Sequence, residues 1–471
     1  MGLGPRPARI RAPTTRADPF PGVGPGGRVD EQSQRITVWL EEQLGGRVTQ
    51  IVRQPRWRPV WFADLERDGE AQALCVRGER SDADIGFSLE HEMRFQRVLE
   101  EHGIPVARVY GWIDEPRAYV MDRVEGRNDF AESSIEERRS VMDEYMQVLA
   151  RIHALPPEPF EKAGILRAKN PRDSSVVGMR RYEEFYRRSK RQPDPFLEFC
   201  LAWLSRNPLD NHGREAPVVW DSGQFHHQGG QVTAILDLEI GHVGDPMMDL
   251  AAFRMRDTVI GFGEFPQLYQ RYAEITGTPV DVAAIQHHHL AFTLTNQLAF
   301  HAALAAPTPE SDFMTNMQWC SETNLFAVEA LAEILDMELP EIEAPPPRDS
   351  AAAVAHAHLV ASLRGLDAGD PYVQHQIRIA FRLARHLQRA DEVGDALAAA
   401  DLDDIAEVTG RRPGSWREGD AALEDFVLED AGRHDEALVG LFHRRLSHYK
   451  MLLGPPGSAM ARHLPIQRFR S

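Results

Sequence analysis

Alternation of apolar and polar residues marks the first part of the chain, and helical spacing marks most of the rest. Before residue 126, helical patterns cover 36–44 and 89–102, and Gly103 supplies a stop signal after the second. Asp68 and Gly69 are typical of a tight turn between two strands. The alternation predicts five strands, at 48–53, 60–66, 72–77, 108–113 and 118–124. Together these elements predict a small, mostly antiparallel sheet with one inserted helix.

Beyond Gly126 the spacing of apolar residues becomes helical, with one short interruption. Within 218–237 the pattern predicts a β-hairpin that turns at Gly229 and Gly230. Helices are expected at 134–154, 182–188 and 195–207, then from 248 to about 337, and in a last unit at 351–363, 371–388 and 436–453. The chain therefore combines a short β-rich region with a long helical one.

These patterns predict five segments and an α+β fold with two lobes. Residues 1–32 are rich in Pro, Gly and Arg and show no hydrophobic period, which predicts a disordered tail. The proline-rich segment 338–348 predicts a linker. The remaining segments are an N-lobe at 33–126, a mainly helical C-lobe at 127–337 and a helical C-terminal domain at 349–471.

Composition and charge exclude several classes of protein. The chain has 471 residues, 42% of them hydrophobic and 26% charged, as in ordinary globular proteins. Its net charge of −18 disfavours binding to nucleic acids, whose backbones are anionic. No stretch has the roughly 18–20 continuous apolar residues that a membrane span requires, and no secretory signal is expected. The three widely spaced cysteines predict neither disulfides nor a zinc site, and we expect a cytoplasmic protein.

The densest chemical signal lies between residues 218 and 251. Asp221 and Gln224 occupy a loop before the predicted hairpin, and Asp237 follows its last strand, so the hairpin brings the two ends together. Phosphoryl transfer requires a carboxylate that orients the attacking hydroxyl, and oxygen ligands that hold Mg²⁺ on the nucleotide phosphates. Asp245 and Asp249 follow in a Gly-Asp-Pro turn that enters a helix. This set of residues is typical of phosphotransferases.

The stretch 235–251 resembles the metal-binding segment of the aminoglycoside phosphotransferase (APH)/choline-kinase-like family. It contains Leu-Asp-Leu-Glu and Gly-Asp-Pro-x-x-Asp-Leu-Ala. The resemblance implies a protein-kinase-like fold with ATP bound between two lobes and a small-molecule hydroxyl as acceptor. It implies that Asp237 binds Mg²⁺, and that Asp249, with Asp245, gives structural support to the catalytic loop. The resemblance covers about residues 33–337.

Four residues of the N-lobe match the family less closely. Glu92 matches the glutamate of the family's inserted helix, and Arg77 stands at the strand position of the basic residue that pairs with it. Arginine can form a two-pronged pair with a carboxylate, so the ion pair is expected to persist. The segment 119–126 resembles the family's hinge, which implies that Met121 and Val124 frame the adenine.

The catalytic loop departs from the family pattern. If the loop is two residues shorter than usual, Asp221 matches the catalytic aspartate and Gln224 the metal-binding asparagine. A match without a gap places Val219 at the aspartate's position and removes the base. We favour the shorter loop.

The nucleotide loop departs further. Residues 54–59 contain no glycine, and two prolines remove backbone donors. Arg56 and Arg58 replace those donors as phosphate ligands, or the loop binds an anionic substrate or partner.

The leading interpretation is an ATP- and Mg²⁺-dependent phosphotransferase that acts on the hydroxyl of a small molecule. The alternative is a catalytically weak or inactive homologue that binds a nucleotide or metabolite as a regulatory or scaffolding module. A third hypothesis makes the C-terminal domain a docking surface for a protein partner. C-lobe helices around 254–257 and 296–301 are expected to line the acceptor site. The family offers amino sugars, choline, hydroxylated acids or hydroxyacyl-thioesters as acceptors, and the sequence does not choose among them.

Overall fold

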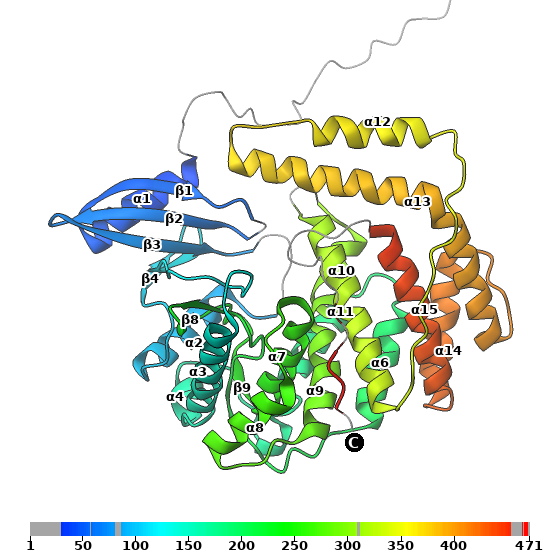
Figure 1. The fold of residues 1–471 in the computed structure, drawn as a ribbon, viewed down its shortest axis with the longest axis horizontal. Helices are drawn as coiled ribbons and strands as arrows, with labels where there is room; N and C mark the ends of the chain where they lie inside the picture. The colour runs from blue at the N-terminus through cyan, green and yellow to red at the C-terminus, as the bar shows by residue number, and fades with distance from the viewer. Residues whose placement is uncertain are drawn as a thin grey trace, which may run out of the picture.

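The N-lobe is built on one antiparallel sheet of five strands in the order β1-β2-β3-β5-β4 (Figure 1). The computed structural model describes residues 30–56, 58–80, 86–308, 311–453, 464 and 466–469. All five predicted strands and the inserted helix are present, preceded by the first predicted helix. The elements of this lobe are α1 (Glu31–Leu44), β1 (Arg47–Arg53), β2 (Val60–Arg67), β3 (Glu70–Gly78), α2 (Leu89–Glu101), β4 (Val109–Ile113) and β5 (Ala118–Asp122).

Helix α1 covers one face of this sheet. Its Ile36 and Leu40 are buried against Trp61 and Val76 of the strands. Asp30 caps the helix by accepting a hydrogen bond from the Ser33 backbone N–H at 2.7 Å. The helix therefore begins two residues inside the predicted disordered segment, and the rest of that segment, residues 1–29, lies outside the described residues.

The C-lobe consists of helices around a short β-hairpin and a two-stranded ladder. The predicted interruption at 218–237 is the hairpin β7–β8, and it turns at Gly229 and Gly230 as expected. The elements are α3 (Ile135–His153), α4 (Glu158–Lys162), the 3₁₀ turn η1 (Pro171–Asp173), α5 (Val177–Ser189), α6 (Pro195–Arg206), β6 (Ala216–Val218), β7 (Phe225–Gln228), β8 (Gln231–Ile235), β9 (His242–Gly244), α7 (Met247–Ile260), α8 (Phe265–Thr276), α9 (Val282–Thr293), α10 (Thr295–Ala305) and α11 (Phe313–Ile334). The predicted α+β arrangement, with a small β-rich lobe followed by a mainly helical one, is confirmed.

The C-terminal helices share a hydrophobic core with the C-lobe. Phe442 stacks on Phe199 of α6 with ring centroids 5.3 Å apart, and Leu423 and Val427 join the same cluster. Residues 338–350 between the two parts form no helix or strand. That the C-terminal domain folds as a separate unit stays a prediction. Its helices are α12 (Ala353–Arg364), α13 (Pro371–Thr409), α14 (Trp416–Asp430) and α15 (Asp435–Leu453).

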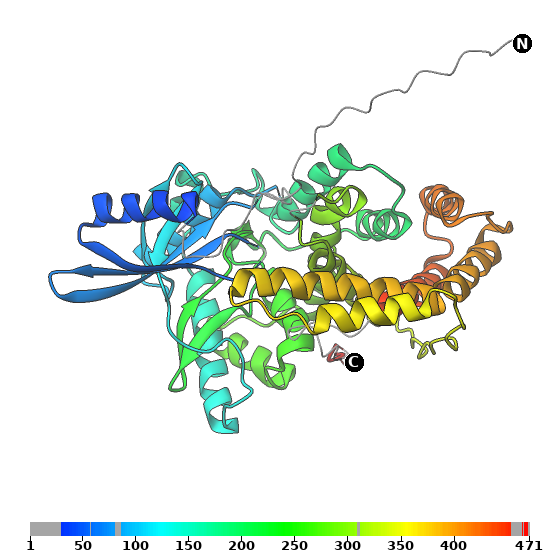
Figure 2. The same cartoon turned by 90° about the horizontal axis from the view of Figure 1, so that it is seen from above.

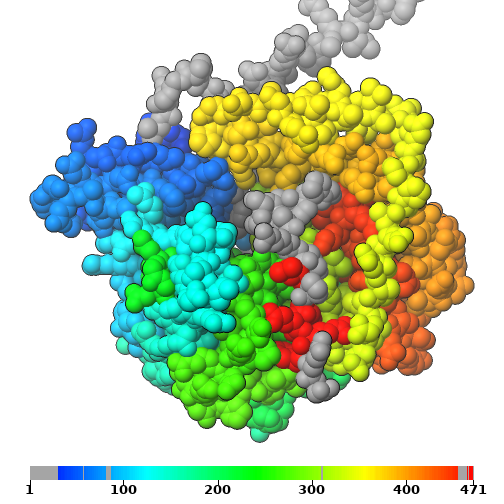
Figure 3. All heavy atoms as spheres, viewed as in Figure 1, coloured from blue at the N-terminus to red at the C-terminus, as the bar shows by residue number. Residues whose placement is uncertain are grey.

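The α12–α13 hairpin extends from the C-terminal helices back to the N-lobe. The two helices run side by side in both ribbon views (Figures 1 and 2), and the space-filling view shows them abutting the N-lobe (Figure 3). At this contact the guanidinium of Arg53, the last residue of β1, lies 4.8 Å from the centre of the Tyr372 ring. Such a cation–π contact stabilises an exposed site by roughly 0.5–1 kcal/mol.

Helix α13 is also attached to the C-lobe. Arg382 donates hydrogen bonds to the Thr315 hydroxyl at 3.0 Å and to the Gln318 side chain, both on α11.

Among the described residues, no helix combines the length and the apolar character that crossing a bilayer requires.

Candidate active site between the two lobes

The loop before β7 and Asp237, the second residue after β8, come together at one end of the hairpin. Trp220 has a φ of 62° and Asp237 a φ of 56°, which is the left-handed region that side chains other than glycine seldom adopt. Such a conformation persists only where the surrounding structure holds it, and it is commonest at functional sites. Both ends of the predicted catalytic hairpin are therefore locally strained.

Gln224 joins the two aspartates of the predicted site. Its side-chain Nε2 donates to Asp221 Oδ2 at 2.7 Å and to Asp237 Oδ2 at 3.1 Å. Two carboxylates from opposite ends of the hairpin therefore lie within hydrogen-bond distance of one amide. This is the proximity that the sequence predicts.

Asp249 holds the backbone of the loop that carries Asp221. Its carboxylate is fully buried and accepts hydrogen bonds from the backbone N–H groups of Val219 at 3.0 Å and Trp220 at 2.6 Å. A ring nitrogen of His153 lies 3.0 Å from the same carboxylate. Charge-assisted bonds to two successive backbone groups fix the loop against the start of α7.

Asp245 fastens the turn that enters α7. It forms a two-pronged ion pair with Arg214, at 3.2 and 3.1 Å, and accepts a hydrogen bond from the backbone of Met247 at 3.0 Å. This geometry agrees with the supporting role predicted for Asp245.

Arg77 and Glu92 form the predicted pair, and Asp237 extends it. Arg77 Nε lies 2.9 Å from Glu92 Oε1, and Arg77 Nη2 lies 2.5 Å from Asp237 Oδ1. Burial would lower the pKa of Arg77, but these two carboxylates outweigh it and raise the pKa. For Asp237 burial would raise the pKa, but Arg77 and Arg58 outweigh it and hold the pKa well below its ordinary value. Asp237 is therefore ionised, as a metal ligand must be.

Arg58 turns inward from the loop between β1 and β2. It donates to Glu92 at 3.1 Å and also contacts Glu239, and its side chain is almost fully buried. Arg56 is exposed, and its charge contributes to the lowered pKa of Asp237, so it faces the same site. In this structure Arg58 therefore bonds two carboxylates, while Arg56 is open to solvent; phosphate binding by either residue stays a prediction.

Arg256 lies in the segment 254–257 that the sequence suggested for the acceptor site, but its pairing with Asp221 was not predicted. Its guanidinium bonds both oxygens of Asp221, with Nη2 2.5 Å from Oδ1 and 2.7 Å from Oδ2. Arg256 follows Asp249 by seven residues, so the two lie on the same face of α7. That spacing is the signal that could have placed Arg256 beside the catalytic loop.

The environment of Asp221 affects its protonation near neutral pH. Burial raises the pKa of Asp221 to about 6, the nearby charge of Asp237 adds to this effect, and Arg256 opposes it. A carboxylate with a pKa close to neutrality is well matched to proton transfer at physiological pH. This pKa agrees with the role of general base, which stays a prediction for Asp221.

The oxygen atoms around Gln224 fit a magnesium ion. The Oδ2 atoms of Asp221 and Asp237 both face the Gln224 amide, which would present its own oxygen after a half turn. Mg²⁺ prefers such hard oxygen ligands, and it often takes only one or two carboxylates from the protein together with water and phosphate oxygens. Across the described ranges no cluster of three His, Cys, Asp or Glu side chains could enclose a metal by itself.

The predicted adenine-framing residues lie at the end of the sheet next to the inter-lobe connection. Met121 belongs to β5, and its sulfur lies 3.5 Å from the Gln96 amide nitrogen. Val124 follows two residues after β5 ends and is half-buried. Their role in framing adenine stays a prediction.

Of the two described segments expected to line the acceptor site, 254–257 and 296–301, only part of the first contacts the candidate base. Arg256 reaches Asp221, whereas Arg254 and Asp257 bond Gln467 near the C-terminus. His301 lies beside Asp194 and makes no described contact with Asp221. Of the residues suggested for the acceptor site, the structure therefore places Arg256 against the candidate base.

Residues 87–284 match the family model described as the phosphotransferase enzyme family, APH. This segment contains Glu92, the catalytic loop, Asp237 and the Asp245–Asp249 turn. The match confirms the resemblance to the APH/choline-kinase-like family that the sequence motifs indicate. It supports small-molecule phosphotransfer as the general class of activity.

Curated relatives extend well beyond this chain. Acyl-CoA dehydrogenase family member 11 of Rattus norvegicus is 26% identical over 217 residues, which are 43% of this chain and 27% of that protein. The Homo sapiens protein of the same name is 26% identical over 246 residues, 47% of this chain and 31% of its own length. The chain thus spans less than a third of the length of these relatives.

Two solved structures align with this chain at low sequence identity. A thermostable mutant of aminoglycoside phosphotransferase APH(4)-Ia in its apo form aligns at 15% identity and a TM-score of 0.44, over 62% of this chain and 97% of that one. Choline kinase LicA from Streptococcus pneumoniae aligns at 15% identity and a TM-score of 0.45, over 64% and 99%.

Proposed function

We propose that this chain is an ATP- and Mg²⁺-dependent phosphotransferase that acts on the hydroxyl group of a small molecule. One observation carries the proposal: the Gln224 amide lies within hydrogen-bond distance of both Asp221 and Asp237, next to the Arg77–Glu92 pair. A base, metal-binding oxygens and a braced cation are the parts that phosphoryl transfer requires.

Asp221 acts on the acceptor in this proposal. Its carboxylate accepts the hydroxyl proton while the hydroxyl oxygen forms a bond to the γ-phosphorus of ATP. The bond between that phosphorus and the bridging oxygen breaks, and ADP leaves with the bond's electron pair. Arg256 is a positioning residue, because its Nε and Nη2 atoms both bond the Asp221 carboxylate and fix its plane.

Asp237 and Gln224 are the residues that would hold Mg²⁺. When bound, the ion neutralises charge on the phosphate oxygens. Arg77 contacts the α- and β-phosphates, and Glu92 fixes its orientation through the 2.9 Å ion pair. Arg56 adds a second cation from the loop between β1 and β2, where glycine N–H groups are absent.

The alternative, a catalytically weak or inactive homologue that binds a nucleotide for regulation, is less well supported. It followed from the altered loops, whereas the proximity of Asp221 and Asp237 supports the shorter-loop match that retains a base. The candidate acceptors are amino sugars, choline, hydroxylated acids and hydroxyacyl-thioesters. An activity screen with compounds of these four classes identifies the acceptor.

Thermal unfolding with and without ATP and Mg²⁺ tests the nucleotide site. Selective binding at a hundredfold excess over Kd stabilises the native protein by about 2.7 kcal/mol. We expect a Mg²⁺-dependent rise in melting temperature for the wild type and the loss of this rise in Asp237→Ala. Asp367→Ala, at an exposed aspartate after α12, is the matched control and should behave as wild type. No shift with any nucleotide would overturn the proposal.

A further inference from the structure

A cavity of about 360 Å³ lies where the C-terminal helices meet the C-lobe. We call it the seam cavity. The volume is in the range of small-molecule sites. The residues of its lining that carry the inference are Asp194, Ser321, Asn324, Asp401, Asp420 and Tyr449.

The seam cavity lies on the opposite side of α11 from the candidate active site. Met317, Ser321 and Asn324 line it, and their spacing of four and three residues puts them on one helix face. Trp319 lies on the other face, where its ring centre is 5.9 Å from the Arg256 guanidinium. Helix α11 therefore separates the two sites.

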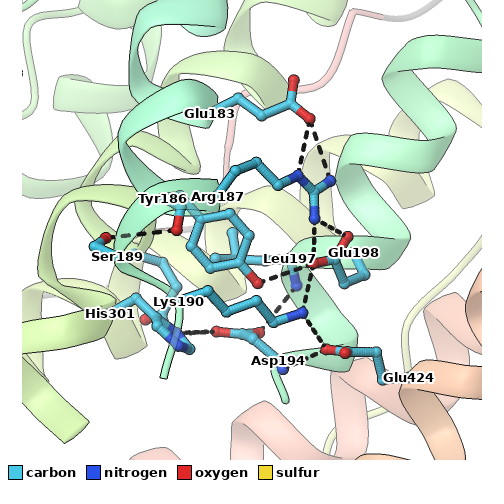
Figure 4. Close-up of polar contacts among 11 residues, drawn as sticks. Glu183, Tyr186, Arg187, Ser189, Lys190, Asp194, Leu197, Glu198, His301 and Glu424 are labelled. Atoms are coloured by element: carbon cyan, nitrogen blue, oxygen red, sulfur yellow. Dashed lines mark hydrogen bonds and ion pairs between the residues drawn. The ribbon is translucent and has the colours of Figure 1, made fainter. Parts of the chain in front are cut away.

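Asp194 brings a carboxylate to the cavity that no lysine or arginine pairs with in the described contacts. Figure 4 shows it capping α6, where it accepts the Leu197 backbone N–H at 3.0 Å and lies 3.1 Å from a His301 ring nitrogen. The Gln297 amide donates to it at 2.8 Å. The neighbouring cation, Lys190, instead bonds Glu198 and Glu424, at 2.7 Å each.

Asp401 and Asp420 add two further carboxylates. Asp401 lies 2.7 Å from a His448 ring nitrogen, and Asp420 pairs with Arg445 at 2.6 Å. Arg445 is the one arginine or lysine among the described residues that line the cavity. Burial raises the pKa of Asp420 against the effect of Arg445, and the charges of Asp194 and Asp401 add to the rise. The three carboxylates therefore act on one another, with a single guanidinium to offset them.

Aromatic rings line the same space. Phe196, Phe313, Phe442 and Tyr449 belong to its lining, and Tyr449 is 38% exposed, at the mouth of the cavity. The faces of aromatic rings attract cations, by roughly 0.5–2 kcal/mol per contact. Acidic side chains among aromatic rings form an environment suited to an organic cation.

Two buried polar atoms of the lining residues have no partner. Ser321 is 1% exposed and Asn324 is 7% exposed. Among the described residues, neither the Ser321 hydroxyl oxygen nor the Asn324 side-chain oxygen has a hydrogen-bond partner. A buried polar atom without a partner costs about 1–3 kcal/mol, and a positive charge placed against the two oxygens can recover part of this cost.

We propose that the seam cavity binds a small organic ammonium ion, with its charge among the three aspartates and its apolar groups against the aromatic rings. Among the described residues, no three His, Cys, Asp or Glu side chains group as metal ligands, and the aromatic lining suits an organic cation better than a metal ion. The occupant contacts both the C-lobe and the C-terminal helices, so its binding stabilises their junction. This proposal does not depend on phosphotransfer.

Tetramethylammonium tests the proposal in the full chain because it has no hydroxyl to phosphorylate. We expect a saturable rise in melting temperature and a heat of binding with tetramethylammonium chloride. Neither is expected with tert-butanol, a neutral molecule of similar size, at an ionic strength matched with sodium chloride. An equal response to both probes, or no saturable response to the cation, would overturn the proposal.

Two variants and one control locate the binding. Asp420→Asn and Tyr449→Leu should each weaken tetramethylammonium binding by about tenfold, through the loss of a charge and of a ring face. Asp403→Asn, at an exposed aspartate on the same helix as Asp401, should bind as wild type. If Asp420→Asn fails to fold, Tyr449→Leu decides the question. Wild-type affinity in a folded variant would place the binding elsewhere and refute the proposal.

Discussion

The Arg256 guanidinium bonds both carboxylate oxygens of Asp221, at 2.5 and 2.7 Å through a single nitrogen. The same helix supplies Asp249, which bonds two backbone groups of the loop that carries Asp221. One face of α7 thus fixes both the position of the candidate base and the orientation of its carboxylate.

Arg256→Gln should move the acidic limb of the pH profile upward. In the wild type, kcat/KM should fall as the pH falls through about 6, because Asp221 becomes protonated. Arg256 lowers the pKa of Asp221, so its removal raises that pKa and shifts the limb to higher pH. The measurement is kcat/KM from pH 5 to 9 with the acceptor found by screening. Arg256→Lys should restore part of the shift, and an unmoved limb would show that Arg256 does not act through Asp221.

Asp221→Asn should lower turnover and preserve nucleotide binding. The loss of a general base typically costs about 10²–10⁴ in rate. Asn keeps the size of the side chain, so the ATP- and Mg²⁺-dependent rise in melting temperature should remain. Single-turnover kinetics with radiolabelled ATP provide the measurement. Wild-type turnover in this variant would favour the gap-free match of the catalytic loop, in which Val219 takes the aspartate's place.

Glu92→Gln should destabilise the whole N-lobe. Glu92 is almost fully buried and pairs with Arg77 and Arg58, so the change leaves two buried cations with weaker partners. Breaking a buried ion pair in this way costs about 3–5 kcal/mol. Urea unfolding monitored by circular dichroism measures the loss. The control is Glu90→Gln on the same helix, where the ion pair with Arg94 is exposed; a loss as small as the control's would mean that the pair adds little.

A chain ending near Glu343 should not keep its fold. Such a truncation removes Phe442, Leu423 and Val427, and it exposes the apolar surface of the C-lobe against which they pack. We expect a lower melting temperature and aggregation during size-exclusion chromatography. If the truncated chain is monomeric and retains activity, the C-terminal helices are dispensable and the hypothesis that they dock a partner loses its support.

Local patterns were sufficient to predict the strands of the N-lobe and the hairpin of the catalytic region. Alternation and turn residues are local signals, and the structure retains them, as at Gly229 and Gly230. The motif spacing likewise predicted that Asp221 and Asp237 approach each other. Each of these features could be recognised from residues that are close together in the sequence or joined by one hairpin.

Contacts between distant segments were not predictable in the same way. Arg58 meets Glu239 across 181 positions, and no local pattern connects them. The predicted end of α13 at 388 was wrong, because the helix continues through Gly394 to Thr409. The intrinsic cost of a helical glycine, roughly 1 kcal/mol, is offset because Val393 and Leu397 are buried beside it. Both the Arg58–Glu239 contact and the full length of α13 therefore depend on tertiary packing.

The contact between Arg53 and Tyr372 limits how the two lobes can move. The lobes are already joined by the chain that follows β5, and the α12–α13 hairpin adds a second connection, because Arg382 attaches α13 to the C-lobe. A cation–π contact is worth roughly 0.5–1 kcal/mol, so the second connection favours one relative arrangement of the lobes without fixing it. Sideways movement of the N-lobe away from the hairpin requires Tyr372 to leave Arg53.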